Sequence, residues 1–328
     1  MTTLTRKTSH RSSSLHIWLR LMAVYLAWGT TYLAIRFAVE TLPPFLMAGT
    51  RFLIAGALLY AYRRLAAGDP PPRRVEWRSA LVVGILLLAG GNGLVSWAEQ
   101  RVASGVAALL VGSAPLWMVL IDALLPAGRA RRPGWGAFAG VGLGLLGIAL
   151  LVGPQQLAGN GLQVDPLGAG ALLLAGFSWA VGSIAGREAR LPASPLLATS
   201  MEMLAGSLSL LLIGALLGEW GRLELAAVSA RSLLGLGYLV VFGSLVGFAA
   251  YTWLLRAAPT PLVATYAYVN PLVAILLGSL LAGEALSPRL LLAAGVILCS
   301  VALINSTRNR VGRVKKAQRE LPELGEAR

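Results

Sequence analysis

The sequence GVAALLVGSAPLW at residues 105–117 is an apolar run with a proline, Pro115, near its middle. A similar run, PLVATYAYVNPLV at residues 261–273, places Pro271 in the corresponding position. A proline inside a helix removes one backbone hydrogen bond, and its ring collides with the preceding turn. In a membrane such a break is tolerated where neighbouring helices, hydroxyl groups or water satisfy the freed carbonyl. Two broken segments at matching positions of two halves are typical of membrane proteins with a solute site between the halves.

The two prolines also predict where backbone polarity is exposed. Each lacks the N–H that would bond the carbonyl four residues earlier, which is Val111 for Pro115 and Ala267 for Pro271. We therefore expect a solute site near the membrane midplane, around these two carbonyls.

Composition points to a membrane protein. Of the 328 residues, 56% are hydrophobic and 13% are charged, and the mean hydropathy is +0.71. The net charge of +14 lies mainly between apolar runs and in the tails, with no basic face interleaved with aromatic residues. We attribute this distribution of positive charge to the orientation of the chain in the membrane and not to nucleic-acid binding. The single cysteine, Cys299, excludes a disulfide framework and a thiolate metal cluster.

Ten apolar stretches are long enough to cross the hydrocarbon core as helices, which takes about twenty residues. Short connections rich in glycine, proline and charge separate them. Their expected limits are 17–37, 44–62, 78–98, 103–125, 134–152, 166–187, 195–217, 232–255, 260–282 and 288–306.

The distribution of Lys and Arg predicts the orientation of these helices. Alternate connections, taken together with both termini, hold 21 of these basic residues, and the opposite set holds 4. Because basic connections stay in the cytoplasm, we expect both termini there, which requires an even number of crossings.

The two halves of the chain also match each other. Shifts of 151 to 156 residues lay Trp28 on Trp179, Pro44 on Pro195, Trp97 on Trp253, Pro115 on Pro271 and Pro133 on Pro288. Each half has five crossings, an odd number, so the second copy must enter the membrane upside down. The predicted fold is an all-α integral membrane protein with two inverted five-helix repeats at 17–152 and 166–306, a cytoplasmic tail at 1–16 and a basic cytoplasmic tail at 307–328.

Several motifs carry a resemblance to a known family. They are Ala-Trp-Gly at 27–29, Arg51-Phe52 after a proline pair, Ala-Ser-Gly-Val-Ala-Ala-Leu-Leu at 103–110, and Gly283-Glu284. In these motifs the chain resembles the drug/metabolite transporter superfamily. Within it, the chain is similar to the ten-helix EamA-domain exporters, close to the YedA-type permeases and related to the YddG-type amino acid exporters. The resemblance covers residues 17–306 and implies an exporter of small metabolites in a bacterial inner membrane.

One position departs from the pattern of that family. An acidic residue that matches Glu284 usually stands where the fourth helix ends, and here Gly128 stands there. Asp122 lies six residues earlier, so the family's glutamate role is not assigned in the first repeat.

The sequence of the expected spans contains no arrangement of residues typical of a catalytic site. The run GLGLLG at residues 142–147 matches a dinucleotide fingerprint, but it lies inside an apolar helix with no preceding strand, where small residues favour close helix packing. Both histidines, His10 and His16, precede the first span. We therefore expect no enzyme activity, no cofactor and no metal site.

Ionisable residues inside membrane spans are candidates for function. Arg36 and Arg187 lie near helix ends, where we interpret them as snorkelling side chains. Arg51, Glu202 and Asp122 have either a structural role or a role in coupling or gating. Arg51 and Glu202 occupy equivalent positions of the repeats, but the inverted insertion places them in opposite leaflets, so we do not expect them to pair.

Aromatic side chains and neutral polar side chains share several of the spans. Polar groups are unfavourable in lipid, so we expect them to face a cavity or another helix. Aromatic walls with a few neutral donors and acceptors suit small amphipathic solutes, whereas phosphate would need several converging Arg or Lys side chains. The expected substrate-binding residues are Trp28, Thr31, Asn92, Trp97, Ser113, Trp117, Trp179, Ser183, Ser244, Tyr251, Tyr266, Tyr268 and Asn270, with helix breaks at Pro115 and Pro271.

These observations predict a secondary-type transporter that moves small metabolites, with aromatic or neutral amino acids or drug-like amphiphiles as solutes, by alternating access. The outward direction comes from the resemblance alone. A nucleotide-sugar or phosphate-ester antiporter of the same superfamily is the alternative. The expected partners are a small-molecule substrate and the lipid bilayer, with no nucleic acid, and the sequence gives no indication of the oligomeric state.

Overall fold

The computed structural model describes residues 14–124, 134–152 and 164–320, and all regular structure within them is helical. The outer parts of the two expected tails and the connection that contains Gly128 and Pro133 lie outside the described residues. Nine segments of the described chain are long and apolar enough to cross a membrane: Ser14–Ala38, Pro44–Ala66, Arg74–Ala98, Ser104–Leu124, Trp135–Val152, Pro166–Glu188, Pro195–Leu216, Ala230–Leu255 and Pro288–Ser306. A further apolar helix, Tyr266–Ala282, has 17 residues.

Several of these segments consist of shorter helices joined end to end, and three include π-helical stretches, η1, η2 and η6. In chain order the elements are α1 (Ser14–Gly29), α2 (Thr31–Ala38), α3 (Pro44–Ala61), η1 (Tyr62–Ala66), α4 (Arg74–Gly84), η2 (Ile85–Gly93), α5 (Leu94–Ala98), α6 (Ser104–Val111), α7 (Ala114–Leu124), α8 (Trp135–Val152), α9 (Pro166–Glu188), α10 (Pro195–Leu216), α11 (Glu219–Arg222), η5 (Leu225–Ala227), α12 (Ala230–Tyr238), η6 (Leu239–Val246), α13 (Gly247–Ala257), α14 (Thr260–Val263), α15 (Tyr266–Ala282) and α16 (Pro288–Glu320).

Proline, polar caps and glycine explain where many of these helices begin and end. Pro44 and Pro195 open α3 and α10, where the first turn does not need the missing N–H. Asp165 accepts a hydrogen bond from the Gly168 N–H at 2.8 Å and so caps α9. The helix α15 stops at Gly283, whose φ of 66° suits a residue without a Cβ.

Small residues allow two helix pairs to pack closely. The helix α8 lies along α16, and α3 lies along α10. A Cβ added at Gly147 of α8 would lie 2.7 Å from Ile297 of α16, and the Ser300 hydroxyl donates to the Gly140 carbonyl at 2.8 Å. Most of the glycine-rich face of α8 therefore serves helix packing, although a Cβ at Gly142 would meet nothing within 4 Å.

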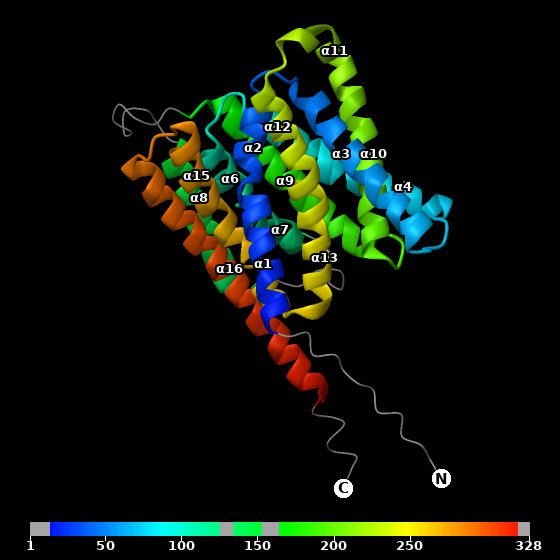
Figure 1. The fold of residues 1–328 in the computed structure, drawn as a ribbon. Coiled ribbons are helices and arrows are strands. Elements are labelled where there is room, and N and C mark those ends of the chain that lie inside the picture. The colour runs from blue at the N-terminus through cyan, green and yellow to red at the C-terminus, as the bar shows by residue number, and fades with distance from the viewer. Residues whose placement is uncertain (1–13, 125–133, 153–163, 321–328) are drawn as a thin grey trace, which may run out of the picture.

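The two helix pairs lie on opposite sides of the bundle. Figure 1 shows α8, α15 and α16 at one side, α3, α4 and α10 at the other, and α1, α7, α9 and α13 between them. The start of α1 and the end of α16 lie at the same end of the bundle, which we call the proximal end. The opposite end, where α2 ends and α3 begins, is the distal end.

The apolar run around Pro115 is interrupted before the proline. The helix α6 ends at Val111 and α7 begins at Ala114, so Pro115 lies in the first turn of α7. The Ser113 hydroxyl donates to the Leu110 carbonyl at 2.5 Å and satisfies one backbone group at the break. Pro115 therefore begins a helix, in a position where its missing N–H is tolerated.

The run around Pro271 is interrupted earlier than the sequence predicts. Pro271 lies inside the continuous helix α15, whose first turn contains Ala267, so the expected break at Pro271 is wrong. The chain instead breaks between α14 and α15, where the Thr265 hydroxyl donates to the Leu262 carbonyl at 2.5 Å and also bonds the Tyr25 hydroxyl. The break is thus fixed by hydroxyl contacts that a proline pattern does not reveal.

Candidate substrate-binding site

A cavity of about 400 Å³ lies inside the helix bundle. Four of its lining residues, Trp28, Thr31, Tyr32 and Ile35, come from α1 and α2 at spacings of three and four residues. This spacing brings them to one helix face. Both interrupted segments also contribute to the wall, with residues on either side of each break. The size suits a small metabolite.

Seven of the expected substrate-binding residues line this cavity, together with the two prolines. They are Trp28, Thr31, Asn92, Trp179, Tyr251, Tyr266 and Asn270, with Pro115 and Pro271. Asn270 is buried, and its Oδ1 has no hydrogen-bond partner among the described residues. Because a buried amide without a partner is unfavourable, Asn270 is suited to bond a solute.

Six expected residues lie outside the cavity wall: Trp97, Ser113, Trp117, Ser183, Ser244 and Tyr268. Trp117 packs edge-to-face on Phe177 of α9, with ring centroids 5.6 Å apart. The guanidinium of Arg101 covers the ring of Trp97 at 5.0 Å, at the distal end of the bundle. These two tryptophans therefore contribute to helix packing rather than to the wall.

Two residues of that group still act on the cavity through a neighbour. The Tyr268 hydroxyl accepts a hydrogen bond from Asn305 Nδ2 at 2.6 Å, and Asn305 lines the cavity. The Ser244 hydroxyl accepts a hydrogen bond from Arg51 Nε at 2.9 Å, and Arg51 lines it as well. Tyr268 and Ser244 therefore each contact a residue of the wall without lining the cavity themselves.

Four aromatic rings form a continuous part of the wall. The ring centroid of Trp28 lies 5.3 Å from that of Phe248, 5.0 Å from that of Tyr251 and 5.3 Å from that of Tyr266. The Trp28 Nε1–H donates to the carbonyl of Gly243 at 3.2 Å, which fixes the indole. Edge-to-face contacts of this kind favour a rigid aromatic surface.

Two of the three π-helical segments, η2 and η6, place polar groups and open backbone at the cavity. Gly91 and Asn92 of η2 and Gly243 of η6 all line it. Single π-turns inside α-helices occur often at functional sites, because they shift the register of the residues that follow. The sequence carries no recognisable signal for them.

The charged residues are distributed differently from the sequence-based prediction. Arg51 lines the cavity, and so does Arg187 at the end of α9, whereas Glu202 and Asp122 lie outside the wall. Among the described residues, no Asp or Glu lines the cavity. Across the same described chain, no group of three or more His, Cys, Asp and Glu side chains is placed to hold a metal ion.

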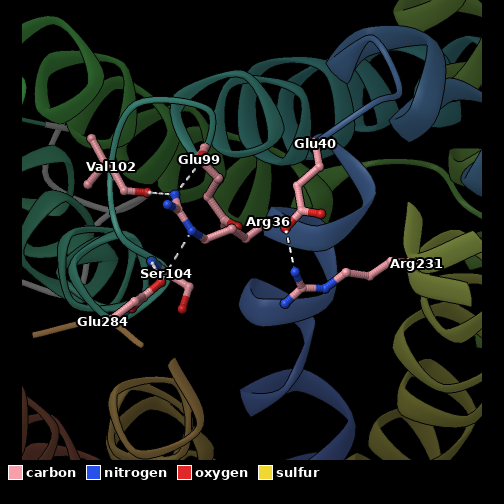
Figure 2. Close-up of polar contacts among 8 residues, drawn as sticks. Arg36, Glu40, Glu99, Val102, Ser104, Arg231 and Glu284 are labelled. Carbon is pink, nitrogen blue, oxygen red and sulfur yellow. Dashed lines mark hydrogen bonds and ion pairs between the residues drawn. The ribbon is translucent and has the colours of Figure 1, made fainter. Parts of the chain in front are cut away.

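Arg36 anchors a group of polar contacts at the distal end (Figure 2). Its Nη1 donates to the carbonyls of Glu99 at 3.0 Å and Val102 at 3.3 Å, and its Nε lies 3.6 Å from Oε1 of Glu284. The interpretation of Arg36 as a snorkelling side chain is therefore wrong, because three partners from two other segments hold its guanidinium.

Glu284 connects the same group to the start of α6. Its carboxylate accepts hydrogen bonds from the backbone N–H groups of Ser104 at 2.7 Å and Gly105 at 3.1 Å. A carboxylate at a helix N-terminus satisfies free N–H groups and is favoured by the helix dipole. Glu284 thus joins α6 to Arg36 at the end of the bundle.

Glu99 lies beside this group and is fully buried. Neither of its carboxylate oxygens has a hydrogen-bond partner among the described residues. Burial, and then the nearby negative charge of Glu284, raise the pKa of Glu99 well above its usual range, against the opposing charges of Arg36 and Arg51. These effects favour the protonated carboxyl group.

Exposure differs along the wall of the cavity. Leu255, at the proximal end, is 48% exposed, whereas Ile35 and Val95, toward the distal end, are 1% and 6% exposed. The wall is therefore closely packed toward the distal end, and the group of contacts around Arg36 lies at this closed end.

Known proteins resemble this chain over most of its length. The EamA-like transporter family matches residues 16–153 and 166–306. The inner membrane transporter YedA of Escherichia coli (strain K12) is 42% identical over 286 residues, which is 87% of this chain and 89% of that protein. A WAT1-related chloroplastic protein of Arabidopsis thaliana is 26% identical and covers 88% of this chain and 69% of its own length. A crystal structure with 25% sequence identity has a TM-score of 0.59 and covers 90% of this chain and 98% of that one.

Proposed function

The chain belongs to the EamA-like transporter family, and on that premise we propose that it exports small amphipathic metabolites across the bacterial inner membrane by alternating access. The observation that carries the proposal is the cavity between the helices, whose wall is closely packed at the distal end beside the contacts of Arg36. We infer that the cavity opens at the proximal end. A solute enters such a cavity from one side of the membrane. It leaves on the other side after the contacts at the closed end break and the entry side closes.

The proposed membrane arrangement has ten crossings in two inverted repeats, with both termini in the cytoplasm. Nine long helices, and the interrupted α14–α15 segment as the tenth crossing, support the count. The family match falls into two separate segments, 16–153 and 166–306, which supports two repeats. With this orientation the proximal end is cytoplasmic, so the cavity faces the cytoplasm.

Aromatic or neutral amino acids and drug-like amphiphiles are the proposed solutes. The wall combines the Trp28 aromatic cluster with the neutral amides of Asn92 and Asn270. An apolar cavity with a few polar groups binds amphipathic solutes well. A phosphate ester would draw several converging cations, and the two arginines of this wall sit at different depths.

Counterflow in liposomes tests the proposal. Full-length protein is reconstituted in liposomes preloaded with unlabelled L-phenylalanine or L-tryptophan, and uptake of the labelled amino acid is measured with and without an imposed proton gradient. We expect counterflow above that of protein-free liposomes. Exchange of a phosphate ester or a nucleotide sugar, with no exchange of amino acids, would favour the antiporter alternative.

A matched pair of tryptophan variants ties the activity to the cavity. Trp28→Ala removes the centre of the aromatic cluster, and Trp220→Ala removes a tryptophan that is 57% exposed on α11, outside the wall. We expect Trp28→Ala to reduce counterflow strongly and Trp220→Ala to leave it near the wild-type rate. Equal effects would place the solute elsewhere.

A further inference from the structure

The deep part of the cavity carries a positive charge. Two charged side chains of the described residues line the wall, Arg51 and Arg187, and both are cationic. Arg187 lies at the end of α9, near the proximal opening. Arg51 lies within α3 and is only 3% exposed. A buried guanidinium of this kind is unfavourable unless something compensates its charge.

The surrounding backbone and side chains fix the position of the Arg51 guanidinium. Its Nε donates to the Ser244 hydroxyl at 2.9 Å, and its guanidinium carbon lies 4.5 Å from the ring centroid of Phe52. A Cβ added at Gly243 would lie 2.9 Å from Arg51 Nη2 and 3.2 Å from the Thr31 hydroxyl. Because glycine has no Cβ, the Arg51 guanidinium fits in this space. These contacts fix the orientation of the guanidinium.

No carboxylate of the described chain forms an ion pair with Arg51, whose two Nη groups also have no hydrogen bond to the described residues. Glu99 is the acidic residue whose charge interacts with Arg51. Burial, the charge of Glu284 and the lack of hydrogen bonds favour the protonated form of Glu99, with a pKa well above its usual range. Within the described part of the chain, the positive charge at the cavity wall thus has no carboxylate paired with it.

The charge adjoins the aromatic cluster. The Arg51 guanidinium fills the space that a Cβ at Gly243 would take, and the Gly243 carbonyl accepts the hydrogen bond from the Trp28 indole. Trp28 in turn packs against Phe248, Tyr251 and Tyr266. A solute that contacts these rings therefore places one end beside Arg51.

We propose that Arg51 binds a carboxylate of the transported solute, so that the cavity selects small monocarboxylates with an aromatic or apolar body, amino acids included. This inference rests on the proposed transport function and names the chemical class of its solutes. A guanidinium matches a carboxylate with two parallel hydrogen bonds, and the free Nη1 and Nη2 edge provides both donors. The Oδ1 of Asn270, which has no partner among the described residues, can accept a hydrogen bond from a donor group of the same solute, such as the ammonium group of an amino acid.

Matched acid and amide ligands test the subsite on the wild-type protein. Binding of 3-phenylpropionate and 3-phenylpropanamide to purified full-length protein in nanodiscs is measured by isothermal titration calorimetry. The two ligands share shape and aromatic ring and differ in charge. We expect the acid to bind about tenfold more tightly or better, the scale of one charge-assisted hydrogen bond.

Substitutions then assign the preference to one arginine. Arg51→Gln should abolish the acid-over-amide preference, and Arg51→Lys should retain part of it, since a lysine keeps the charge but not the planar fork. Arg190→Gln, at an exposed arginine outside the wall, is the control and should keep the preference. Should Arg51→Gln fail to fold, as judged by its gel-filtration profile, Ser244→Ala replaces it, because it releases the Nε contact that orients the guanidinium. We expect that variant to show a reduced preference.

The outcomes separate this inference from the transport proposal. Equal binding of acid and amide by wild type, or an unchanged preference in Arg51→Gln or its replacement Ser244→Ala, overturns the carboxylate subsite. If amino acid counterflow persists in liposomes made with the same purified protein, the transport function still stands. Absence of both counterflow and binding overturns the two proposals together.

Discussion

Arg36 and Glu284 meet across the distal end of the bundle, with Arg36 Nε 3.6 Å from Glu284 Oε1 (Figure 2). Arg36 belongs to α2, in the first half of the chain, and Glu284 follows α15, in the second half. This contact joins the halves at the closed end of the cavity. In an alternating-access cycle, contacts of this kind must break before the cavity opens at that end.

Arg36→Gln is expected to increase access to the cavity from the distal side. The contact is partly exposed, so its loss is worth at most about 1 kcal/mol, or roughly a fivefold shift of the equilibrium between closed and open forms. Thr31→Cys, in a Cys299→Ser background, provides a label site on the cavity wall. The measurement is the labelling rate with a membrane-impermeant maleimide added from the periplasmic side.

Arg231→Gln is the matched control for this experiment. Its guanidinium lies 3.2 Å from Glu40, with both side chains largely exposed, in a pair that lies near Arg36 at the same end of the bundle (Figure 2). We expect its labelling rate to equal that of the parent. If both arginine variants label alike, the contact of Arg36 with Glu284 does not keep the cavity closed.

Glu99 is expected to make the folded protein less stable as the pH rises. Its pKa is raised in the folded protein, first by burial and then by the Glu284 charge, while Arg36 and Arg51 oppose the shift. Tyr32 is another titratable group affected by Glu99. The folded state therefore holds one more proton than the unfolded state between the unfolded pKa, about 4.3, and the raised folded pKa. Its contribution to stability is complete below about pH 4.3 and is lost as the pH rises through the folded pKa.

Melting temperatures of detergent-solubilised protein at several pH values between 5 and 9 measure this dependence. Glu99→Gln keeps the size of the side chain and removes its titration, so the decline with pH should be smaller in this variant. Glu224→Gln, at an exposed carboxylate, is the control and should follow the wild type. Parallel curves for all three proteins would show that Glu99 titrates normally.

Gly84→Ala is expected to destabilise the contact between α4 and α10. A Cβ at this position would lie 2.5 Å from the Glu202 carbonyl oxygen and 3.0 Å from the Gly206 nitrogen, both backbone atoms that cannot rotate away. Overpacking of this kind costs about 1–3 kcal/mol. Gly170→Ala, at a helical position with nothing within 4 Å, is the control. The melting temperature should fall for the first variant alone.

Asn270→Ala is expected to impair transport more than Ala114→Ser, although both positions line the cavity. The Asn270 Oδ1 has no hydrogen-bond partner among the residues that the structure describes and is suited to a solute contact, whereas Ala114 offers only a methyl group. We expect KM in counterflow to rise about tenfold for Asn270→Ala, the scale of one lost hydrogen bond, and less than about twofold for Ala114→Ser. Equal and mild effects would contradict a direct role of the amide.

The sequence predicted the family and most of the spans because both depend on local pattern. Apolar run length defines the helices, and the aromatic residue Trp28 and the amide Asn270 lie in the wall as expected. The break near Pro271 was misplaced because it depends on the hydroxyl contact between Thr265 and Tyr25, 240 residues apart in sequence. Contacts that join distant segments leave no trace in a local pattern.

The same limit explains the errors at charged and aromatic positions. Arg36 lies near a helix end, as a snorkelling side chain would. Its contact with Glu284 joins two distant parts of the sequence and forms only when the chain folds. Trp117 lies on a span that lines the cavity, but its ring packs on Phe177 of another helix. The face that a residue presents depends on how each helix is rotated in the bundle, and in helices hydrophobic all round the sequence does not encode that rotation.

The break before α15 also bears on how the chain enters the membrane during synthesis. The continuous helix of 17 residues spans about 26 Å, less than the roughly 30 Å of hydrocarbon, and it carries the amide of Asn270. A nascent segment that is short and contains a polar side chain is inserted weakly when it acts alone. Its stable insertion therefore depends on helices made before it, among them α1, whose Tyr25 bonds Thr265 at the break. On this argument, α15 inserts against helices that are already in the membrane rather than by its own hydrophobicity.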